Sequence, residues 1–381
     1  MRVKLKDIFD LQMGKTPSRS NLEYWNTTDY KWISIADLTK TSKYIFETKE
    51  YLSKSAIKDS GIKVIPANTV VMSFKLSIGK TAITKEDMYS NEAIMAFKDK
   101  HVINIIPEYI FYLFKYKNWE EGSNKAVMGK TLNKATLSEI EVEICSIEKQ
   151  RQIVNILDKI MSAVDGRKQE LQLLDELIKA RFVEMFGDCT NMISLSDLCL
   201  IITDGTHQSP KFQHEGIPFI LVSNLSKNTV TYDTDKFISA ETYKELYKRT
   251  PIEIGDILLS TVGSYGHPAV VVEDRKFLFQ RHIAYLKPKS DILNSYYMHG
   301  ALLSPGCQRQ IEEKVKGIAQ KTLNLSEIRK IRIPVPSLDL QKQYADFVHQ
   351  VNKSKFDTMT FAPIYAIINL YLHTYFYQGR R

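Results

Sequence analysis

The clearest hydrophobic pattern in this chain is a long amphipathic stretch near its middle. Between Glu148 and Phe186 apolar residues recur at steps of three and four, charged residues stand between them, and proline is absent. This spacing places the apolar side chains on one face of an α-helix. We therefore predict a continuous helix that ends near Gly187 and is about 60 Å long at 1.5 Å per residue.

A helix of this length needs a partner for its apolar face. A second amphipathic stretch begins near Ser337 and carries Tyr344, Phe347, Val348 and Val351. We predict that the two helices pair antiparallel and relate the halves of the chain by a pseudo-twofold axis. The alternative is two unrelated amphipathic helices, each packed on its own domain.

The tail of the chain departs from this helical pattern. The stretch from Phe361 to Tyr377 is apolar and aromatic, and Pro363 interrupts it. It is shorter than the ~20 residues that a membrane span needs. We predict a packed helix without a membrane role, separated from the preceding helix because proline breaks helices.

The remainder of the chain is an internal repeat. Leu137-Ser138-Glu139-Ile140 recurs about 188 residues later as Leu325-Ser326-Glu327-Ile328. Repeating units of solenoids run roughly 20–50 residues, so the long period indicates a duplicated domain. Apolar strand patterns, glycines and helix entries also recur in order: residues 32–38 match 219–225, 68–73 match 255–260, Gly14 matches Gly205, Gly79 matches Gly266, and residues 148–153 match 339–344.

These patterns predict an α+β protein with two similar mixed α/β domains separated by long helices. The predicted boundaries are 1–147 for the first domain, 148–187 for the central helix, 188–336 for the second domain and 337–381 for the C-terminal helix and tail. The scaffold repeats, but its loops differ, since Lys15-Thr16-Pro17 aligns with Thr206-His207-Gln208 and Asn91-Glu92 aligns with Gln280-Arg281.

Composition narrows the class of partner. The net charge is +8 and the apolar fraction is 44%, which suits a folded protein that binds an acidic partner, with nucleic acid first. The four cysteines form no CxxC pair and show no zinc spacing, as expected in a reducing compartment. The N-terminus lacks the apolar run of a signal peptide, so we expect a cytoplasmic protein without a bound metal.

Catalytic motifs are not found in the sequence. Three Gly-Lys-Thr tripeptides, at residues 14–16, 79–81 and 129–131, lack the earlier glycine of a phosphate-binding loop. Asp37 with Glu47 and Lys49 loosely matches a nuclease metal site. The second copy has Asn224, Asp233 and Asp235 instead, so the constellation is not retained.

The order of these features resembles the specificity subunit of type I restriction-modification systems. The resemblance covers about residues 1–355 and rests on the duplication, the closing Leu-Ser-Glu-Ile, the segment Ile333–Leu338, and the long helix ending near Phe186-Gly187-Asp188. Asp204-Gly205-Thr206-His207 with Pro210, followed by residues 216–220, is similar to a motif frequent in the target-recognition domains of that family.

The resemblance implies a non-catalytic subunit whose two target-recognition domains read a bipartite, asymmetric site in double-stranded DNA. It further implies that the helices set the gap and dock two modification (methyltransferase) subunits, joined by restriction/translocase subunits. S-adenosylmethionine, ATP and Mg would bind on those partners, and this chain would hold no cofactor. The alternatives are a duplicated protein–protein adaptor and a stand-alone nuclease.

Candidate DNA-contacting residues are polar side chains just beyond strands or glycine turns. In the first domain they are Lys15, Ser18, Arg19, Lys75, Ser77 and Lys80. In the second they are Thr206, His207, Gln208, Lys211, Ser264, Tyr265, His267, Gln280, Arg281 and His282. The candidate partner-binding positions on the central helix are Ile153, Ile160, Leu171, Leu174 and Ile178.

Overall fold

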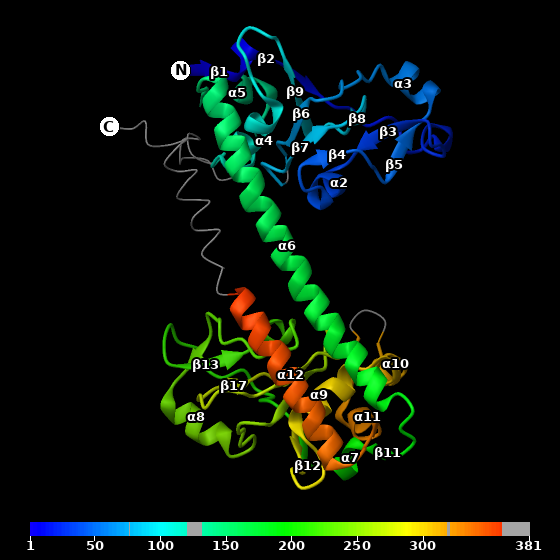
Figure 1. The fold of residues 1–381 in the computed structure, drawn as a ribbon, viewed down its shortest axis with the longest axis vertical. Helices are drawn as coiled ribbons and strands as arrows, with labels where there is room; N and C mark the ends of the chain where they lie inside the picture. Colours follow the sequence, from blue (N-terminus) through cyan, green and yellow to red (C-terminus); the bar gives the residue numbers. More distant parts are fainter. Residues whose placement is uncertain (76, 120–131, 318–320, 360–381) are drawn as a thin grey trace. The chain divides into compact units, whose positions relative to one another are not determined.

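The structure is a computed structural model, and it describes residues 1–75, 77–119, 132–317 and 321–359 (Figure 1). The chain divides near residue 166 into two compact units. Each unit contains one copy of the repeat together with one half of the long helix α6 (Ile147–Phe186). The domain boundaries drawn from the sequence, which treat this helix as a separate region, remain predictions. The predicted tail helix and residues 129–131 lie outside the described residues.

The first unit contains a five-stranded sheet in the order β2-β9-β6-β7-β4 and a three-stranded sheet in the order β5-β3-β8. Strand β1 pairs antiparallel with β10, which joins the two ends of the lobe. The strands are β1 Arg2–Lys4, β2 Phe9–Met13, β3 Tyr30–Ile33, β4 Tyr44–Ile45, β5 Glu50–Leu52, β6 Val70–Ser73, β7 Thr81–Thr84, β8 Tyr89–Ser90, β9 Ile94–Asp99 and β10 Glu141–Glu143. The helices are α1 Leu5–Ile8, η1 Leu22–Tyr24, α2 Ile35–Lys40, α3 Lys54–Ser60, α4 Pro107–Tyr116 and α5 Lys134–Ser138.

The second unit repeats this plan. Its sheets have the orders β12-β18-β15-β16 and β14-β13-β17, and β11 pairs with β19 where β1 pairs with β10. The strands are β11 Met192–Ser194, β12 Cys199–Asp204, β13 Ile217–Ile220, β14 Phe237–Ile238, β15 Ile257–Ser260, β16 Pro268–Val270, β17 Leu278–Phe279, β18 Ile283–Pro288 and β19 Arg332–Pro334. The helices are α7 Leu195–Leu198, η2 Val222–Leu225, α8 Ala240–Tyr247, α9 Ser295–Leu303, α10 Pro305–Lys314, α11 Leu325–Arg329 and α12 Leu338–Met359.

The two copies make the same backbone hydrogen bond at the glycine after their first long strand, β2 in one lobe and β12 in the other. Gly14 N donates to Ile94 O at 3.1 Å, and Gly205 N donates to Ile283 O at 3.2 Å. A Cβ at either glycine would lie 2.2 Å from a backbone oxygen, which explains why both copies need glycine there. The first lobe differs by its edge strand β4, which pairs parallel with β7. The predicted α+β fold of two duplicated mixed domains is confirmed.

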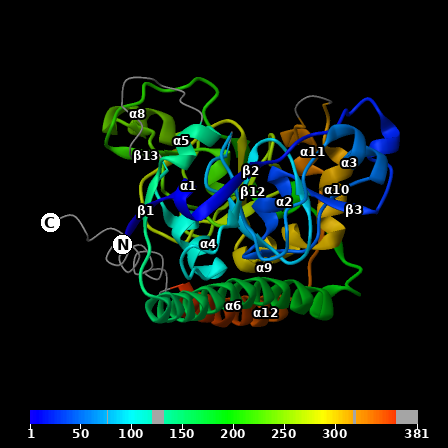
Figure 2. The ribbon, with the colours of Figure 1, turned by 90° about the horizontal axis from the view of Figure 1, so that it is seen from above.

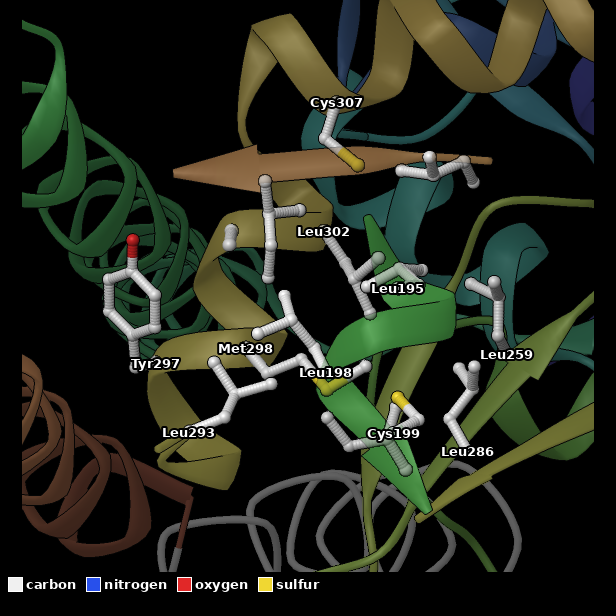
Figure 3. Packing of buried hydrophobic residues seen from close by; sticks show 14 of the residues in the cluster. Leu195, Leu198, Cys199, Leu259, Leu286, Leu293, Tyr297, Met298, Leu302 and Cys307 are labelled. Carbon is white, nitrogen blue, oxygen red and sulfur yellow. The ribbon is translucent and has the colours of Figure 1, made fainter. Parts of the chain in front are cut away.

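The buried strands explain how each lobe holds its loops. All four residues of β6, β7 and β15 are buried, as expected for strands covered on both faces. In the second lobe, apolar side chains from α7, α9, β12, β15 and β18 fill one core cluster (Figure 3). The loops at the strand ends therefore project from a rigid frame.

The two long helices meet within the second unit. Lys355 near the end of α12 forms an ion pair with Asp175 of α6, while Tyr344 near its start lies 5.4 Å from Phe182 and 5.7 Å from Phe186 between ring centroids. The helices thus run antiparallel along this stretch, and α12 lies beside α6 in Figure 1 and Figure 2. The predicted antiparallel pairing is observed for the second half of α6. The first half packs its apolar face, including Ile153 and Leu157, against its own lobe.

Candidate nucleic-acid interface

Three loops of the first lobe meet around one carboxylate. The hydroxyl of Thr16, in the loop after β2, donates to the carboxylate of Glu92, in the turn before β9. This hydrogen bond, then one from the backbone of Glu92 itself and then the positive charges of Lys75 and Arg19, lower the pKa of Glu92 below its ordinary value. Lys75 lies in the loop after β6. Lys75 and Arg19, which were predicted from separate segments of the sequence, therefore lie near the same carboxylate. The lowered pKa means that Glu92 remains ionised at neutral pH.

Several predicted contact residues of the first lobe also bind within their own lobe. The Lys15 ammonium donates to Ser60 O, and the Lys80 ammonium donates to Thr39 Oγ1 at 2.5 Å. The carbonyl of Ser77 accepts a hydrogen bond from the Ser73 hydroxyl. Ser18 is exposed, and its hydroxyl lies 2.8 Å from that of Ser20. These groups border the same loops, but some of their donors already have protein partners.

Arg19 is held in an aromatic site. Its guanidinium lies 3.7 Å from the ring centroid of Trp25 and 4.9 Å from that of Trp32, and it pairs with both carboxylate oxygens of Glu50. Trp25 and Trp32 pack edge to face at 4.9 Å. Stacking and ion pairing fix this cation at one place. It therefore acts as a fixed charge beside Glu92.

In the second lobe the loop after β12 is organised by Asp204. The carboxylate of Asp204 lies 3.0 Å from His207 Nε2 and 2.7 Å from Arg249 Nη2. The backbones of Thr206 and Gln280 form a parallel β-bridge, and Thr206 O accepts a hydrogen bond from Arg281 N at 3.2 Å. Gln208 and Lys211 are exposed on the same loop. The loops carrying residues 204–211 and 280–282 are therefore adjacent.

The hairpin turn between β15 and β16 joins the same surface. Thr261 N donates to His282 O at 3.0 Å. His267 Nδ1 lies 3.0 Å from Asn228 Oδ1. Ser264 is exposed, and the ring of Tyr265 lies 5.9 Å from the Lys321 ammonium. The structure brings all ten predicted residues of this lobe onto neighbouring loops.

His282 is the candidate whose protonation is best defined. Burial and the neighbouring Arg281 lower the pKa of His282 below its ordinary value of 6.5. Arg281 Nε donates to His282 Nε2 at 3.3 Å, which requires a neutral imidazole with a free lone pair. His282 is thus a hydrogen-bonding group and not a positive charge at neutral pH.

The equivalent turns of the two lobes present opposite charges. Asn91 N donates to Ile33 O, and Gln280 N donates to Ile220 O, both at 3.1 Å. The next residue is Glu92 in the first lobe and Arg281 in the second. Glu92 was not among the residues predicted from the sequence, although its alignment with the predicted residue Arg281 could have identified it. Arg249 was not among them either, because its distance of 45 residues from Asp204 leaves no local signal.

The nuclease-like residues have a structural role. Asp37 Oδ2 accepts from Ser34 N at 2.8 Å, and Asp37 Oδ1 accepts from Lys49 N at 3.1 Å. In the second lobe Asn224 Oδ1 accepts from Leu221 N at 3.0 Å. Both side chains accept a hydrogen bond from the backbone amide three residues earlier, so Asn224 holds the same turn as Asp37. Within the described ranges no group of three or more His, Cys, Asp or Glu residues could hold a metal ion.

The candidate partner positions on α6 differ in accessibility. Ile153 is 2% exposed and lies in the core of the first lobe. Ile160 and Ile178 pack partly against the two cores, and Leu171 and Leu174 are half-buried. The exposed large apolar side chains of the helix are Leu173 at 55%, Val183 at 49%, Leu177 at 47% and Ile156 at 37%. The predicted positions are therefore less accessible than these side chains.

Comparison with known proteins identifies the class of this two-lobed chain. The family described as "Type I restriction modification DNA specificity domain" matches residues 1–176 and again residues 190–363. The chain belongs to this family of type I restriction-modification specificity subunits. No helix among the described residues is long and apolar enough to cross a membrane.

Individual relatives agree with this assignment. The chain is 24% identical over 373 residues to the type I restriction enzyme MjaIX specificity subunit of Methanocaldococcus jannaschii, covering 91% of this chain and 85% of that protein. It is 24% identical over 261 residues to the EcoBI specificity subunit of Escherichia coli, covering 60% of this chain and 55% of that protein.

Solved structures support the fold. A chain from a study of complex assembly and conformational transition of the type I R-M system gives a TM-score of 0.57 at 17% identity, over 97% of this chain and 95% of that chain. The type I restriction-modification S subunit from M. genitalium gives a TM-score of 0.53 at 13% identity, over 99% of this chain and 96% of that chain.

Proposed function

We propose that this specificity subunit reads a bipartite, asymmetric DNA site, with one half-site for each lobe, and that it is itself non-catalytic. The observation that carries the proposal is the pairing of a repeated frame with different loops. At equivalent turns the first lobe presents Glu92 and the second presents Arg281. Two heads with opposite charges at the same position would select different bases.

The chemistry of these loops suits readout in the major groove. An arginine donates two hydrogen bonds to guanine O6 and N7, and a glutamate accepts from cytosine N4. Lysines such as Lys75 and Lys211 would bind phosphates and set the register without reading sequence. The net charge of +8 supports this contact, since phosphate neutralisation supplies much of the affinity.

Partner subunits would dock on the long helices. Leu173, Leu177 and Val183 are exposed apolar side chains on α6, and a modification subunit would cover some of them. Two such subunits would bind S-adenosylmethionine and methylate adenine, and restriction/translocase subunits would bind ATP and Mg. The assembled complex would act in the cytoplasm, where the cell's DNA lies.

Selection from a random-sequence duplex pool tests this function. The chain would be used alone and co-expressed with its modification subunit, and bound DNA would be sequenced. We expect one enriched motif with two defined parts and an unspecified gap of fixed length. Failure to enrich any sequence in the presence of the modification subunit would contradict the proposal. Methyl transfer or metal-dependent cleavage by the chain alone would contradict the non-catalytic assignment.

A further inference from the structure

Each long helix has one fully buried glutamine in its first turn. Gln150 is the fourth residue of α6 and Gln341 is the fourth residue of α12. Both are 0% exposed. A fully buried polar side chain in a first helical turn is costly unless all its groups are paired. Its occurrence at the same place in both copies indicates a specific role.

The hydrogen bonds of the two glutamines match one for one. Gln150 Oε1 accepts from Ile106 N at 2.9 Å, and its Nε2 donates to Asn104 O and Cys145 O, each at 3.0 Å. Gln341 Oε1 accepts from Asn294 N at 2.9 Å, and its Nε2 donates to Ile292 O and Pro336 O, each at 3.0 Å. Both donor hydrogens and one acceptor site of each amide are therefore satisfied.

The partners of each glutamine belong to the lobe and to the helix entry. Ile106 and Asn294 are the residues that cap α4 and α9. Cys145 and Pro336 lie just before α6 and α12. Each amide therefore ties the first turn of a long helix to the start of a lobe helix. We call this connection between a long helix and its lobe the joint. A second hydrogen bond supports each joint: the Tyr109 hydroxyl of α4 donates to Glu143 O, and the Tyr297 hydroxyl of α9 donates to Pro334 O.

We propose that Gln150 and Gln341 are positioning residues that set the length of the DNA gap the protein accepts. This inference rests on the proposed function. A helix of 40 residues is about 60 Å long at 1.5 Å per residue. A tilt of about 3° at its root displaces its far end by about 3 Å, close to the 3.4 Å rise of one base pair. Measuring a gap to one base pair therefore requires a joint that does not tilt.

The sequence provides matched controls. Gln152 and Gln343 follow the two buried glutamines by two residues, and both are exposed. The variants are Gln150→Met and Gln341→Met, which keep side-chain length but remove the amide, with Gln152→Met and Gln343→Met as controls. Each would be co-expressed with the modification subunit and used to select DNA from a random-sequence pool.

We expect the wild-type complex and both controls to enrich one gap length. In Gln150→Met and Gln341→Met the two half-motifs should persist. The preference for the native gap over its neighbours should fall about tenfold, because without these buried hydrogen bonds the joint tilts more easily. A single gap with undiminished preference in both variants would overturn the inference and leave the proposed function intact. Absence of any motif with the wild-type complex would instead reject the proposed function.

Hydrogen exchange tests the joint independently of DNA. In the wild-type protein the amides of Ile106 and Asn294 should exchange slowly, because each donates to a buried glutamine. Gln150→Met should speed exchange at Ile106, and Gln341→Met at Asn294, while the controls should not. If these two amides exchange in the wild-type protein as fast as amides in exposed loops, the glutamines do not fix the helices to the lobes. This measurement uses the wild-type protein alone, so it does not depend on the variants folding.

Discussion

Glu92 and Arg281 follow equivalent turns of the two lobes, where one is a carboxylate and the other a guanidinium. Glu92 accepts from Thr16 and lies near Lys75 and Arg19. Arg281 lies against the neutral imidazole of His282. The lowered pKa of Glu92 keeps its carboxylate charged at neutral pH. The two half-sites would therefore be read by fixed charges.

Removing the charge of Glu92 should strengthen binding to DNA of unrelated sequence. We expect Glu92→Gln to raise this non-specific affinity roughly threefold at low salt, since one screened surface charge is worth at most about 1 kcal/mol. Titration of a fluorescent duplex would measure it. Glu23→Gln, at an exposed position outside the three loops, is the control. An unchanged or weakened affinity for Glu92→Gln would show that the carboxylate does not face DNA.

The lowered pKa of Glu92 predicts the pH range of its effect. For an acid with a depressed pKa, the stabilising interaction is complete above the ordinary value of 4.5 and is lost as the pH falls through the lower value in the folded state. The affinity difference between wild type and Glu92→Gln should therefore be constant between about pH 6 and 8. A difference that disappears within that range, measured by the same titration, would mean that Glu92 is protonated near neutrality.

The paired glycines predict a stability effect in both lobes. Gly14→Ala and Gly205→Ala each place a Cβ against backbone oxygens, so each should destabilise its lobe by about 1–3 kcal/mol. Gly166→Ala is the control, because nothing lies within 4 Å of its added Cβ and alanine favours a helix by up to about 1 kcal/mol. Thermal unfolding should show lower Tm values for the first two and an unchanged or higher Tm for the third.

At the residue scale the sequence located the loops but not the state of their side chains. Lys75, Arg281 and His282 could be chosen because they follow glycine turns or strands. That Arg19 stacks on Trp25 and pairs with Glu50 depends on contacts across the three-stranded sheet, which no local pattern encodes. The partner of Asp204, Arg249, is distant in sequence for the same reason.

At the scale of elements, one helix carries both a core face and an exposed face. Phe182 is 5% exposed and contacts Phe186, Tyr297 and Tyr344, whereas Leu173 is 55% exposed. The hydrophobic period predicted the helix and its buried face. It did not separate buried from accessible apolar residues, because Ile153 follows the same spacing as the exposed leucines yet is covered by its own lobe.

These two faces predict separable effects of substitution. Phe182→Ala should destabilise the second lobe by about 3–5 kcal/mol because it leaves a cavity in the aromatic cluster. Leu173→Ala should change stability by less than about 0.5 kcal/mol but weaken co-purification with the modification subunit. Denaturant unfolding and affinity capture would measure the two effects. Normal capture of a Leu173→Ala and Leu177→Ala double variant would place the partner elsewhere.

At the scale of the whole molecule, binding should depend strongly on salt. Each lysine that neutralises a phosphate adds about 0.9 to the slope of log affinity against log salt concentration. Lys75→Ala should therefore lower that slope by about 1 and leave the selected motif unchanged. Affinity measured at several salt concentrations checks this. A changed motif with an unchanged slope would make Lys75 a base-reading residue.

The duplicated architecture was readable from one sequence because both copies keep the groups that build the frame. Gly14 with Gly205, Asp37 with Asn224 and Gln150 with Gln341 occupy matching hydrogen-bonding positions. Edge strand β4 was not predicted, since it has two residues and exists through its pairing with β7.

The most direct test of the central claim compares the DNA motifs selected by Glu92→Gln and by Arg281→Gln, each in complex with the modification subunit. If each lobe reads its own half-site, Glu92→Gln relaxes one part of the motif and Arg281→Gln relaxes the other, with the gap unchanged in both. If both variants alter the same part, or either alters both parts, the two lobes do not read separate half-sites.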